Sequence, residues 1–131
     1  MNIALAAHDS KKVLMENLCI GYRNILSKHN IFATGVTGRV VEMATGLLVA
    51  KYLEGQLGGE QQMTAQIAHN QIDLVIYLCD PNYAYQGECG IISIMQACNA
   101  NNVPFATNLA TAEVLFLALD RGDLNWREIV R

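Results

Sequence analysis

Residues 72–79 have the sequence IDLVIYLC, and this run is the clearest strand in the chain. Its apolar residues are continuous rather than alternating, which is typical of a strand in a parallel sheet covered on both faces. Asp80 and Pro81 follow directly and are expected to end the strand. Four further runs, on either side of it along the chain, have strand character: residues 2–7 (NIALAA), 29–34 (HNIFAT), 47–53 (LLVAKYL) and 103–107 (VPFAT).

The intervals between these runs are long enough for helices, and apolar residues recur in them at helical spacing. Helices are expected over residues 10–28, 39–45, 60–70, 89–101 and 109–119, with glycines breaking the chain before the second. Residues 124–131 are the candidate for a further short strand. Strand and helix units repeated at such intervals indicate parallel pairing. We therefore predict one α/β domain over residues 1–131: a doubly wound, mostly parallel five-stranded sheet with helices on both faces.

The composition is that of a globular domain. The chain has 131 residues, of which 52% are hydrophobic and 16% charged, and this excludes disorder. A net charge of −3 and an isoelectric point near 5.5 argue against a nucleic-acid partner, which requires a basic surface. No apolar run approaches the roughly 20 residues of a membrane helix, and the amino terminus lacks the basic segment of a signal peptide. We expect a cytoplasmic protein with no membrane partner, whose high apolar content is compatible with burial between subunits.

The four cysteines show no metal or redox pattern. Cys19, Cys79, Cys89 and Cys98 form no CxxC pair and have no metal-ligand spacing. Cys79 and Cys98 lie inside apolar segments, where a free thiol packs as a small hydrophobic group. We predict reduced thiols, with Cys89 the most exposed, and no metal site.

Polar residues and glycines gather where the predicted strands end. Ligands of doubly wound sheets bind outside the carboxyl ends of the strands, so these segments form the candidate site. They are residues 7–9 (AHD), 33–35 (ATG), 54–55 (EG), 79–81 (CDP) and 106–108 (ATN).

One candidate group would bind an anion. Residues 34–38 (TGVTG) follow a strand and open a helix, so their free amides and two threonine hydroxyls favour a phosphate. An ordinary turn between a strand and a helix is the alternative. Lys12, on the first turn of the helix after residues 2–7, would extend its ammonium toward the same pocket. The alternative for Lys12 is a solvated surface charge.

A second candidate group would move protons. His8 and Asp9 end the first strand, and a histidine beside a carboxylate at this place suits acid–base chemistry. Alternatively, Asp9 only caps the next helix. A loop with three glycines places Glu60 at a helix amino terminus, where the helix dipole stabilises a carboxylate. Glu60 is therefore either a base or an ordinary first-turn residue. The three glycines are Gly55, Gly58 and Gly59.

Five motifs span essentially the whole chain: IALAAHD (3–9), ATGVTG (33–38), GQLGGEQQ (55–62), DLVIYLCDP (73–81) and VPFATNLATAE (103–113). Their order and spacing resemble those of the methylglyoxal synthase family. The resemblance implies a homohexameric lyase of the glycolytic bypass that converts dihydroxyacetone phosphate to methylglyoxal and phosphate. In that family a carboxylate removes a proton alpha to the carbonyl, and the enediolate expels phosphate. No metal or organic cofactor is used, and phosphate commonly inhibits.

The resemblance also implies roles for individual residues. Glu60 stands at the position of the catalytic carboxylate, and His8 and Asp9 match the pocket histidine and aspartate. The residues expected to bind the substrate or its phosphate are Lys12, Thr34, Gly35, Thr37, Gly38, Gly55, Gly58 and Gly59.

The chain shows four departures from the family pattern, in three motifs. Val36 replaces the middle threonine of ATGTTG and removes a hydroxyl. Glu54 stands where a phosphate-binding serine belongs, and Glu60 replaces the catalytic aspartate. Gly87 and Gly90 stand at the histidine and the later aspartate of the family's PHxPD segment, in which the histidine polarises the substrate oxygens.

These departures leave alternatives open. Tyr83 or Tyr85 would supply a replacement donor for the histidine, whereas simple packing is the other explanation for a tyrosine there. A catalytically impaired relative would bind a small anion or metabolite as a regulatory module, as the related domain of carbamoyl-phosphate synthetase does. A further alternative is a lyase or isomerase that acts on a different phosphorylated substrate.

Overall fold

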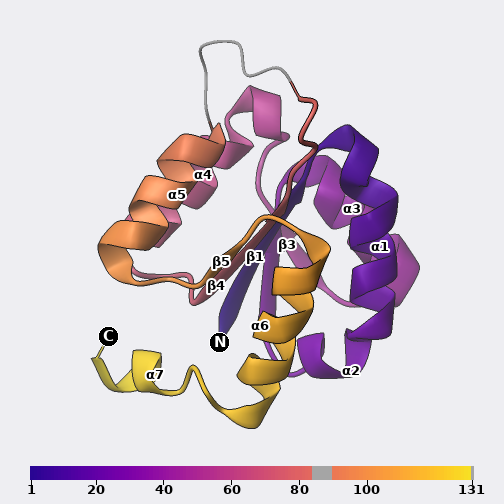
Figure 1. Cartoon of the computed structure of the whole chain (residues 1–131). Helices are drawn as coiled ribbons and strands as arrows, with labels where there is room; N and C mark the ends of the chain where they lie inside the picture. The colour runs from indigo at the N-terminus through magenta and orange to yellow at the C-terminus, as the bar shows by residue number, and fades with distance from the viewer. Residues whose placement is uncertain (84–89, 131) are drawn as a thin grey trace.

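The computed structural model, which describes residues 1–83 and 90–130, is a parallel sheet between two layers of helices (Figure 1). Its strands follow the order β3-β2-β1-β4-β5, and every neighbouring pair is parallel. The strands are β1 (Asn2–Ala7), β2 (Asn30–Ala33), β3 (Val49–Lys51), β4 (Leu74–Leu78) and β5 (Phe105–Ala106). The predicted five-stranded α/β fold is confirmed.

The helices divide between the two faces of the sheet. Helices α1, α3 and α6 cover one face, and α4 and α5 cover the other (Figure 1). The α-helices are α1 (Lys12–Gly21), α2 (Arg23–Leu26), α3 (Gly35–Thr45), α4 (Gly59–Ala68), α5 (Gly90–Asn101), α6 (Leu109–Arg121) and α7 (Trp126–Val130). Two short 3-10 helices are η1 (Asp9–Lys11) and η2 (Gly55–Leu57).

Strand β4 packs into two separate cores. Leu74, Ile76 and Leu78 belong to the cluster on the α1, α3 and α6 side, whereas Val75 and Tyr77 belong to the cluster on the α4 and α5 side. All of them are at most 4% exposed. Side chains of a strand alternate between its faces, so a run without polar residues is required to fill both cores. The strand expected at residues 72–79 is therefore observed, and burial on both faces explains its continuous apolar sequence, as predicted.

The start of α3 differs from the expectation. The helix begins at Gly35 rather than at residue 39, because Thr34 is still extended and Gly35 is already helical. Gly38 lies inside the helix, where an added Cβ would come within 2.7 Å of the Lys51 Cγ. This glycine therefore permits close packing of α3 on β3 and does not break the chain. The helix expected over residues 10–28 is likewise interrupted, because Tyr22 separates α1 from α2.

The carboxyl-terminal segment is helical, and the expected further strand at residues 124–131 is wrong over its described part. Arg127 of α7 is only 2% exposed, and its Nε donates to Asp73 Oδ1 at 3.2 Å. The other guanidinium nitrogens donate to Asn70 Oδ1 and to the carbonyls of Ile72, Asn101 and Asn102. A polar network therefore holds this segment, and strand pairing does not.

No helix in residues 1–83 and 90–130 has the length and apolarity needed to cross a membrane. Cys19 and Cys98 are free and buried, and Cys79 is half-buried. Burial raises the pKa of the Cys19 and Cys98 thiols to about 12. Cys89, the residue expected to be the most exposed cysteine, lies outside the described residues.

Replacing Arg127 with Met should destabilise the fold strongly. The substitution leaves the fully buried Asp73 carboxylate without its charged partner, and breaking such a pair typically costs about 3–5 kcal/mol. Denaturant unfolding followed by far-UV circular dichroism measures the loss. Arg121→Met is the matched control, because Arg121 pairs with Asp123 at the exposed surface. Equal unfolding midpoints for the two variants would contradict this role of Arg127.

Candidate active site

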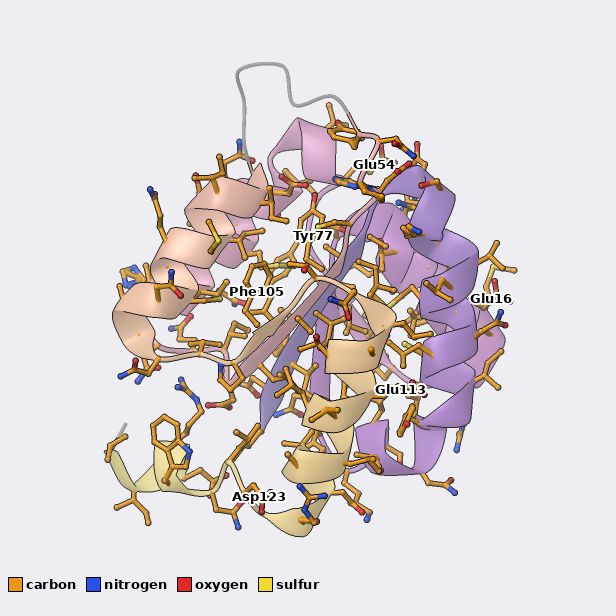
Figure 2. All side chains as sticks on the ribbon, viewed as in Figure 1. Glu16, Glu54, Tyr77, Phe105, Glu113 and Asp123 are labelled. Atoms are coloured by element: carbon orange, nitrogen blue, oxygen red, sulfur yellow. The ribbon has the colours of Figure 1, made fainter. Side chains whose placement is uncertain are left out.

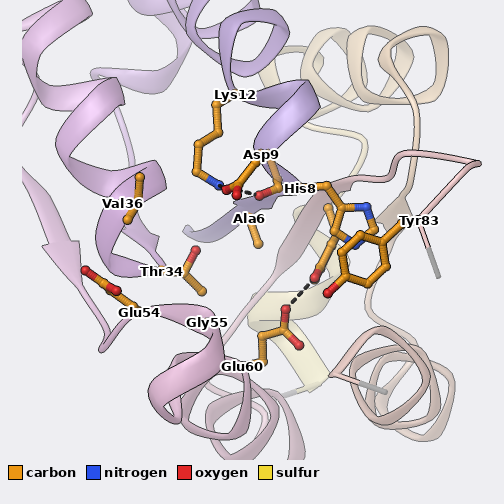
Figure 3. A pocket seen from close by; sticks show the side chains of 12 residues that line it. Ala6, His8, Asp9, Lys12, Thr34, Val36, Glu54, Gly55, Glu60 and Tyr83 are labelled. Carbon is orange, nitrogen blue, oxygen red and sulfur yellow. Dashed lines mark hydrogen bonds and ion pairs between the residues drawn. The ribbon is translucent and has the colours of Figure 1, made fainter. Parts of the chain in front are cut away.

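A cavity of about 240 Å³ lies at the carboxyl ends of β1, β2 and β4 (Figure 3). This is the edge of the sheet where ligands of doubly wound folds bind. The lining residues are Ala6, Ala7, His8, Asp9, Lys12, Thr34, Val36, Glu54, Gly55, Glu60, Tyr77 and Tyr83. All three predicted acid–base residues therefore face one space, together with Lys12, Thr34 and Gly55 of the predicted phosphate-binding set.

His8 is positioned by the pairing of β1 with β4. Its backbone N–H donates to the Leu78 carbonyl at 3.1 Å, and its ring Nδ1 accepts from the Asp80 backbone N–H at 2.8 Å. The neutral ring then carries its proton on Nε2. Burial lowers the pKa of His8, although the charges of Glu60 and Asp80 oppose this effect. His8 is therefore a neutral imidazole at pH 7 and a hydrogen-bond donor through Nε2.

Glu60 lies in the first turn of α4, and its carboxylate is anchored by Tyr77. Its Oε1 accepts a hydrogen bond from the Tyr77 phenol, and its side chain crosses Gly55, where an added Cβ would lie 3.4 Å from Oε1. Gly58 and Gly59 do not line the cavity and instead shape the loop. Gly58 has a φ of +108°, and an added Cβ at Gly59 would lie 2.0 Å from the Leu53 carbonyl oxygen.

Lys12 lies at the rim of the cavity, above the end of β1. Its Nζ donates to the Ala7 carbonyl at 2.7 Å and pairs with Asp9 Oδ1 at 3.1 Å. The Lys12 side chain is 18% exposed and the Asp9 side chain is 98% exposed. Asp9 thus borders the cavity from solvent, and its clearest contact is the ion pair that orients Lys12.

The amino terminus of α3 offers groups that suit an anion. The Gly35 amide donates to the Leu53 carbonyl and the Gly38 amide donates to the Thr34 carbonyl, so both are occupied. The amides of Val36 and Thr37 make no hydrogen bond to any described residue. Thr37 Oγ1 is buried and also has no partner within residues 1–83 and 90–130. Gly35, Thr37 and Gly38 lie behind the cavity lining rather than in it.

Glu54, which differs from the family serine, has a nearby cation. Arg39 Nη2 lies 3.2 Å from Glu54 Oε1. The Glu54 carboxylate points away from Glu60 and Lys12 (Figure 3). The Arg39 guanidinium therefore offsets the negative charge that Glu54 brings to the cavity lining. Sequence reasoning missed Arg39, because nothing in the residue pattern indicates a pair between α3 and the loop after β3.

Two tyrosines line the cavity, and the sequence indicated only one of them as a candidate hydrogen-bond donor. Tyr83, a candidate replacement donor, lines the cavity and stacks on the His8 ring with centroids 4.1 Å apart. Tyr77 was missed, because a tyrosine in a buried strand is typical of packing. Tyr85 and Gly87 lie outside the described residues. Within the described part of the chain, no group of three or more His, Cys, Asp or Glu side chains could hold a metal ion.

The fold and the cavity together define an α/β domain with a polar small-molecule site at its strand ends. Residues 15–107 match the MGS-like domain family. The methylglyoxal synthase of Caldicellulosiruptor saccharolyticus is 56% identical over 99% of this chain and 92% of its own length. That of Thermoanaerobacterium thermosaccharolyticum is 52% identical over 100% and 98%. The crystal structure of the Elizabethkingia anophelis methylglyoxal synthase superposes with a TM-score of 0.81 at 37% identity, covering 88% of this chain and 76% of that one. The chain belongs to the methylglyoxal synthase family.

Removing the Arg39 charge should weaken the binding of inorganic phosphate. Arg39→Ala leaves Glu54 uncompensated beside the cavity, and a bare carboxylate near an anion lowers its affinity roughly threefold to tenfold at low salt. Isothermal titration calorimetry measures the dissociation constant. Arg39→Ala/Glu54→Ser should restore the affinity, because both charges of the pair are then absent.

Lys28→Ala is the control for net charge, since Lys28 pairs with Asp120 at another exposed surface. Phosphate affinity that falls equally in Lys28→Ala and Arg39→Ala would show a general charge effect and would contradict the local role of Arg39.

Proposed function

We propose that this chain converts dihydroxyacetone phosphate to methylglyoxal and phosphate, with Glu60 as the general base. One observation carries the proposal: the Glu60 carboxylate and a set of cationic and hydrogen-bond-donating groups border the same cavity. The relatives support the same activity, because full-length relatives at 52–56% identity are named methylglyoxal synthase. Their names favour this lyase over a regulatory anion-binding module or a lyase with another substrate.

The phosphate of the substrate would bind between Lys12 and the amino terminus of α3. The Lys12 ammonium, the unpaired amides of Val36 and Thr37, and the Thr34 hydroxyl would supply positive charge and donors there. Asp9 keeps Lys12 in place from the solvent side. Gly55 allows the substrate to approach the loop backbone closely. This placement puts the three-carbon chain between α3 and Glu60.

Glu60 would then remove a proton from the hydroxymethyl carbon, which is alpha to the carbonyl. The electron pair of that C–H bond forms the enediolate, and its oxygen becomes negative. His8 would donate from Nε2 to this oxygen, and one such donor typically contributes roughly 100-fold to 1000-fold in rate. The carbon–oxygen bond to phosphate then breaks, and phosphate leaves with the electron pair. The enol that remains takes a proton on its methylene carbon, loses the proton of its enol hydroxyl and so becomes methylglyoxal.

We extend the proposal to the setting of the enzyme. The substrate is phosphorylated, as the relatives imply, and free phosphate, as the product, would compete for the α3 site. The reaction needs no metal or organic cofactor, since the enediolate is stabilised by donors. A cytoplasmic homohexamer that acts in the glycolytic bypass is the assembly and place we propose from the family. Exposed apolar side chains, including Met43 at 89%, Leu48 at 90% and Ile129 at 83%, support association between copies.

Replacing Glu60 with Gln should abolish turnover while leaving phosphate binding intact. The amide keeps the size of the side chain and still accepts from Tyr77, but it is not a base. Loss of a general base costs roughly 100-fold to 10,000-fold. Methylglyoxal and phosphate release measure turnover, and calorimetry with inorganic phosphate measures binding.

Glu16→Gln is the control, because Glu16 lies on the outer side of α1, away from the cavity (Figure 2). A wild-type protein that binds phosphate but makes no methylglyoxal above the buffer rate would contradict the proposal and favour the binding module.

A further inference from the structure

Tyr77 reaches the cavity from inside the sheet. It lies on β4 next to the carboxyl end, and it is 4% exposed. Its ring belongs to the core on the α4 and α5 side, and the His8 ring meets it edge-on with centroids 5.4 Å apart. The phenol oxygen donates to Glu60 Oε1. A purely apolar core position would be served by Phe, so the hydroxyl requires its own explanation.

The Tyr77 phenol anchors the Glu60 carboxylate, and Gly55 leaves space beside it. Tyr77 donates to Oε1, and no other hydrogen bond to the carboxylate occurs among the described residues. The Glu60 side chain also lies near Gly55, where an added Cβ would come into van der Waals contact with it. One oxygen of the carboxylate is therefore committed to the phenol, and Oε2 is left for the substrate.

We infer that Tyr77 is a positioning residue, which fixes the orientation of the Glu60 carboxylate so that Oε2 faces the carbon that loses its proton. This inference rests on the proposed function. Glu has one more rotatable bond than Asp, so a base carried on Glu is less restricted unless something anchors its end. A hydrogen bond from a rigid, buried ring supplies that anchor. Misplacement of a reacting group by 1 Å costs on the order of 100-fold in rate, which sets the scale of the effect.

Tyr77 acts as a donor and not as a proton source. Burial, and to a smaller degree the hydrogen bond to Glu60, raise the pKa of the Tyr77 phenol far above its usual range. The phenol therefore stays protonated wherever Glu60 is charged. Because its hydrogen goes to a carboxylate rather than to the substrate, the role of Tyr77 is to orient the base.

The test is Tyr77→Phe in the full chain, with kcat and KM for dihydroxyacetone phosphate measured across pH. We expect kcat to fall roughly tenfold to 100-fold, while KM changes less than about twofold, because the phosphate contacts are untouched. Losing a donor to a carboxylate makes its charged form less favourable. The acidic limb of the kcat/KM profile should therefore move to higher pH.

Tyr52→Phe is the matched control. Its phenol is also partly buried and donates to a side chain, Gln66 Oε1, and it stacks on Phe32 outside the cavity lining. This variant should retain the wild-type kcat and pH profile. If Tyr52→Phe and Tyr77→Phe lose kcat equally, with no change in the acidic limb, core packing explains the loss and the inference is overturned.

A second set of measurements, in the Glu60→Asp variant, isolates the contact between Tyr77 and Glu60. Glu60→Asp shortens the side chain by one methylene and withdraws the carboxylate from the phenol. Tyr77→Phe should then cost less than about twofold in kcat, whereas it costs tenfold or more beside Glu60, and this non-additivity measures the coupling. Equal costs in both backgrounds would overturn the positioning role.

The wild-type result separates the two proposals. A wild-type chain that makes no methylglyoxal overturns the proposed function and the positioning role with it. An active wild type whose kcat and pH profile are unchanged by Tyr77→Phe overturns the positioning role alone.

Discussion

The parallel pairing of β1 with β4 is the constraint on which the site depends. Both strands are buried on both faces, so they occupy the middle of the sheet and their carboxyl ends emerge side by side. The ladder continues one residue further, because the His8 amide donates to the Leu78 carbonyl. The Asp80 backbone N–H then donates a hydrogen bond to the His8 ring. Backbone pairing thus places the His8 imidazole.

The same strand is anchored at its other end. Asp73 directly precedes β4, and its carboxylate meets the buried Arg127 guanidinium of α7. The carboxyl-terminal segment therefore fixes the start of the strand whose end carries Tyr77 into the cavity. Stability and site geometry are linked through β4, since a shift of this strand would move Tyr77 and the Asp80 amide together.

Two departures from the family pattern have a local partner in this chain. Glu60, one methylene longer than the family aspartate, is met by the Tyr77 phenol. Glu54, an acid in place of a serine, is met by Arg39. An added carboxylate near a phosphate site is repulsive, and an added torsion at a base is disordering. These partners offset both costs, so the substitutions are compatible with the activity proposed from the site.

The sequence by itself determined the fold class, the five strands and the neighbourhood of the site. Continuous apolar runs and helical periodicity are local properties, and parallel pairing brings all strand ends to one edge. The strand ends therefore indicated a site near His8 and Thr34, and the resemblance to the methylglyoxal synthase family added Lys12 and Glu60 to it. Only the tertiary structure decided the helical start of α3 at Gly35, the helix at residues 126–130 and the partners of the charged groups. The hydrogen bonds of Tyr77 to Glu60, Arg39 to Glu54 and Arg127 to Asp73 join residues 17, 15 and 54 positions apart. Such contacts depend on how helices and loops pack across the sheet. No local pattern of residue types indicates which of these residues lie close together in space.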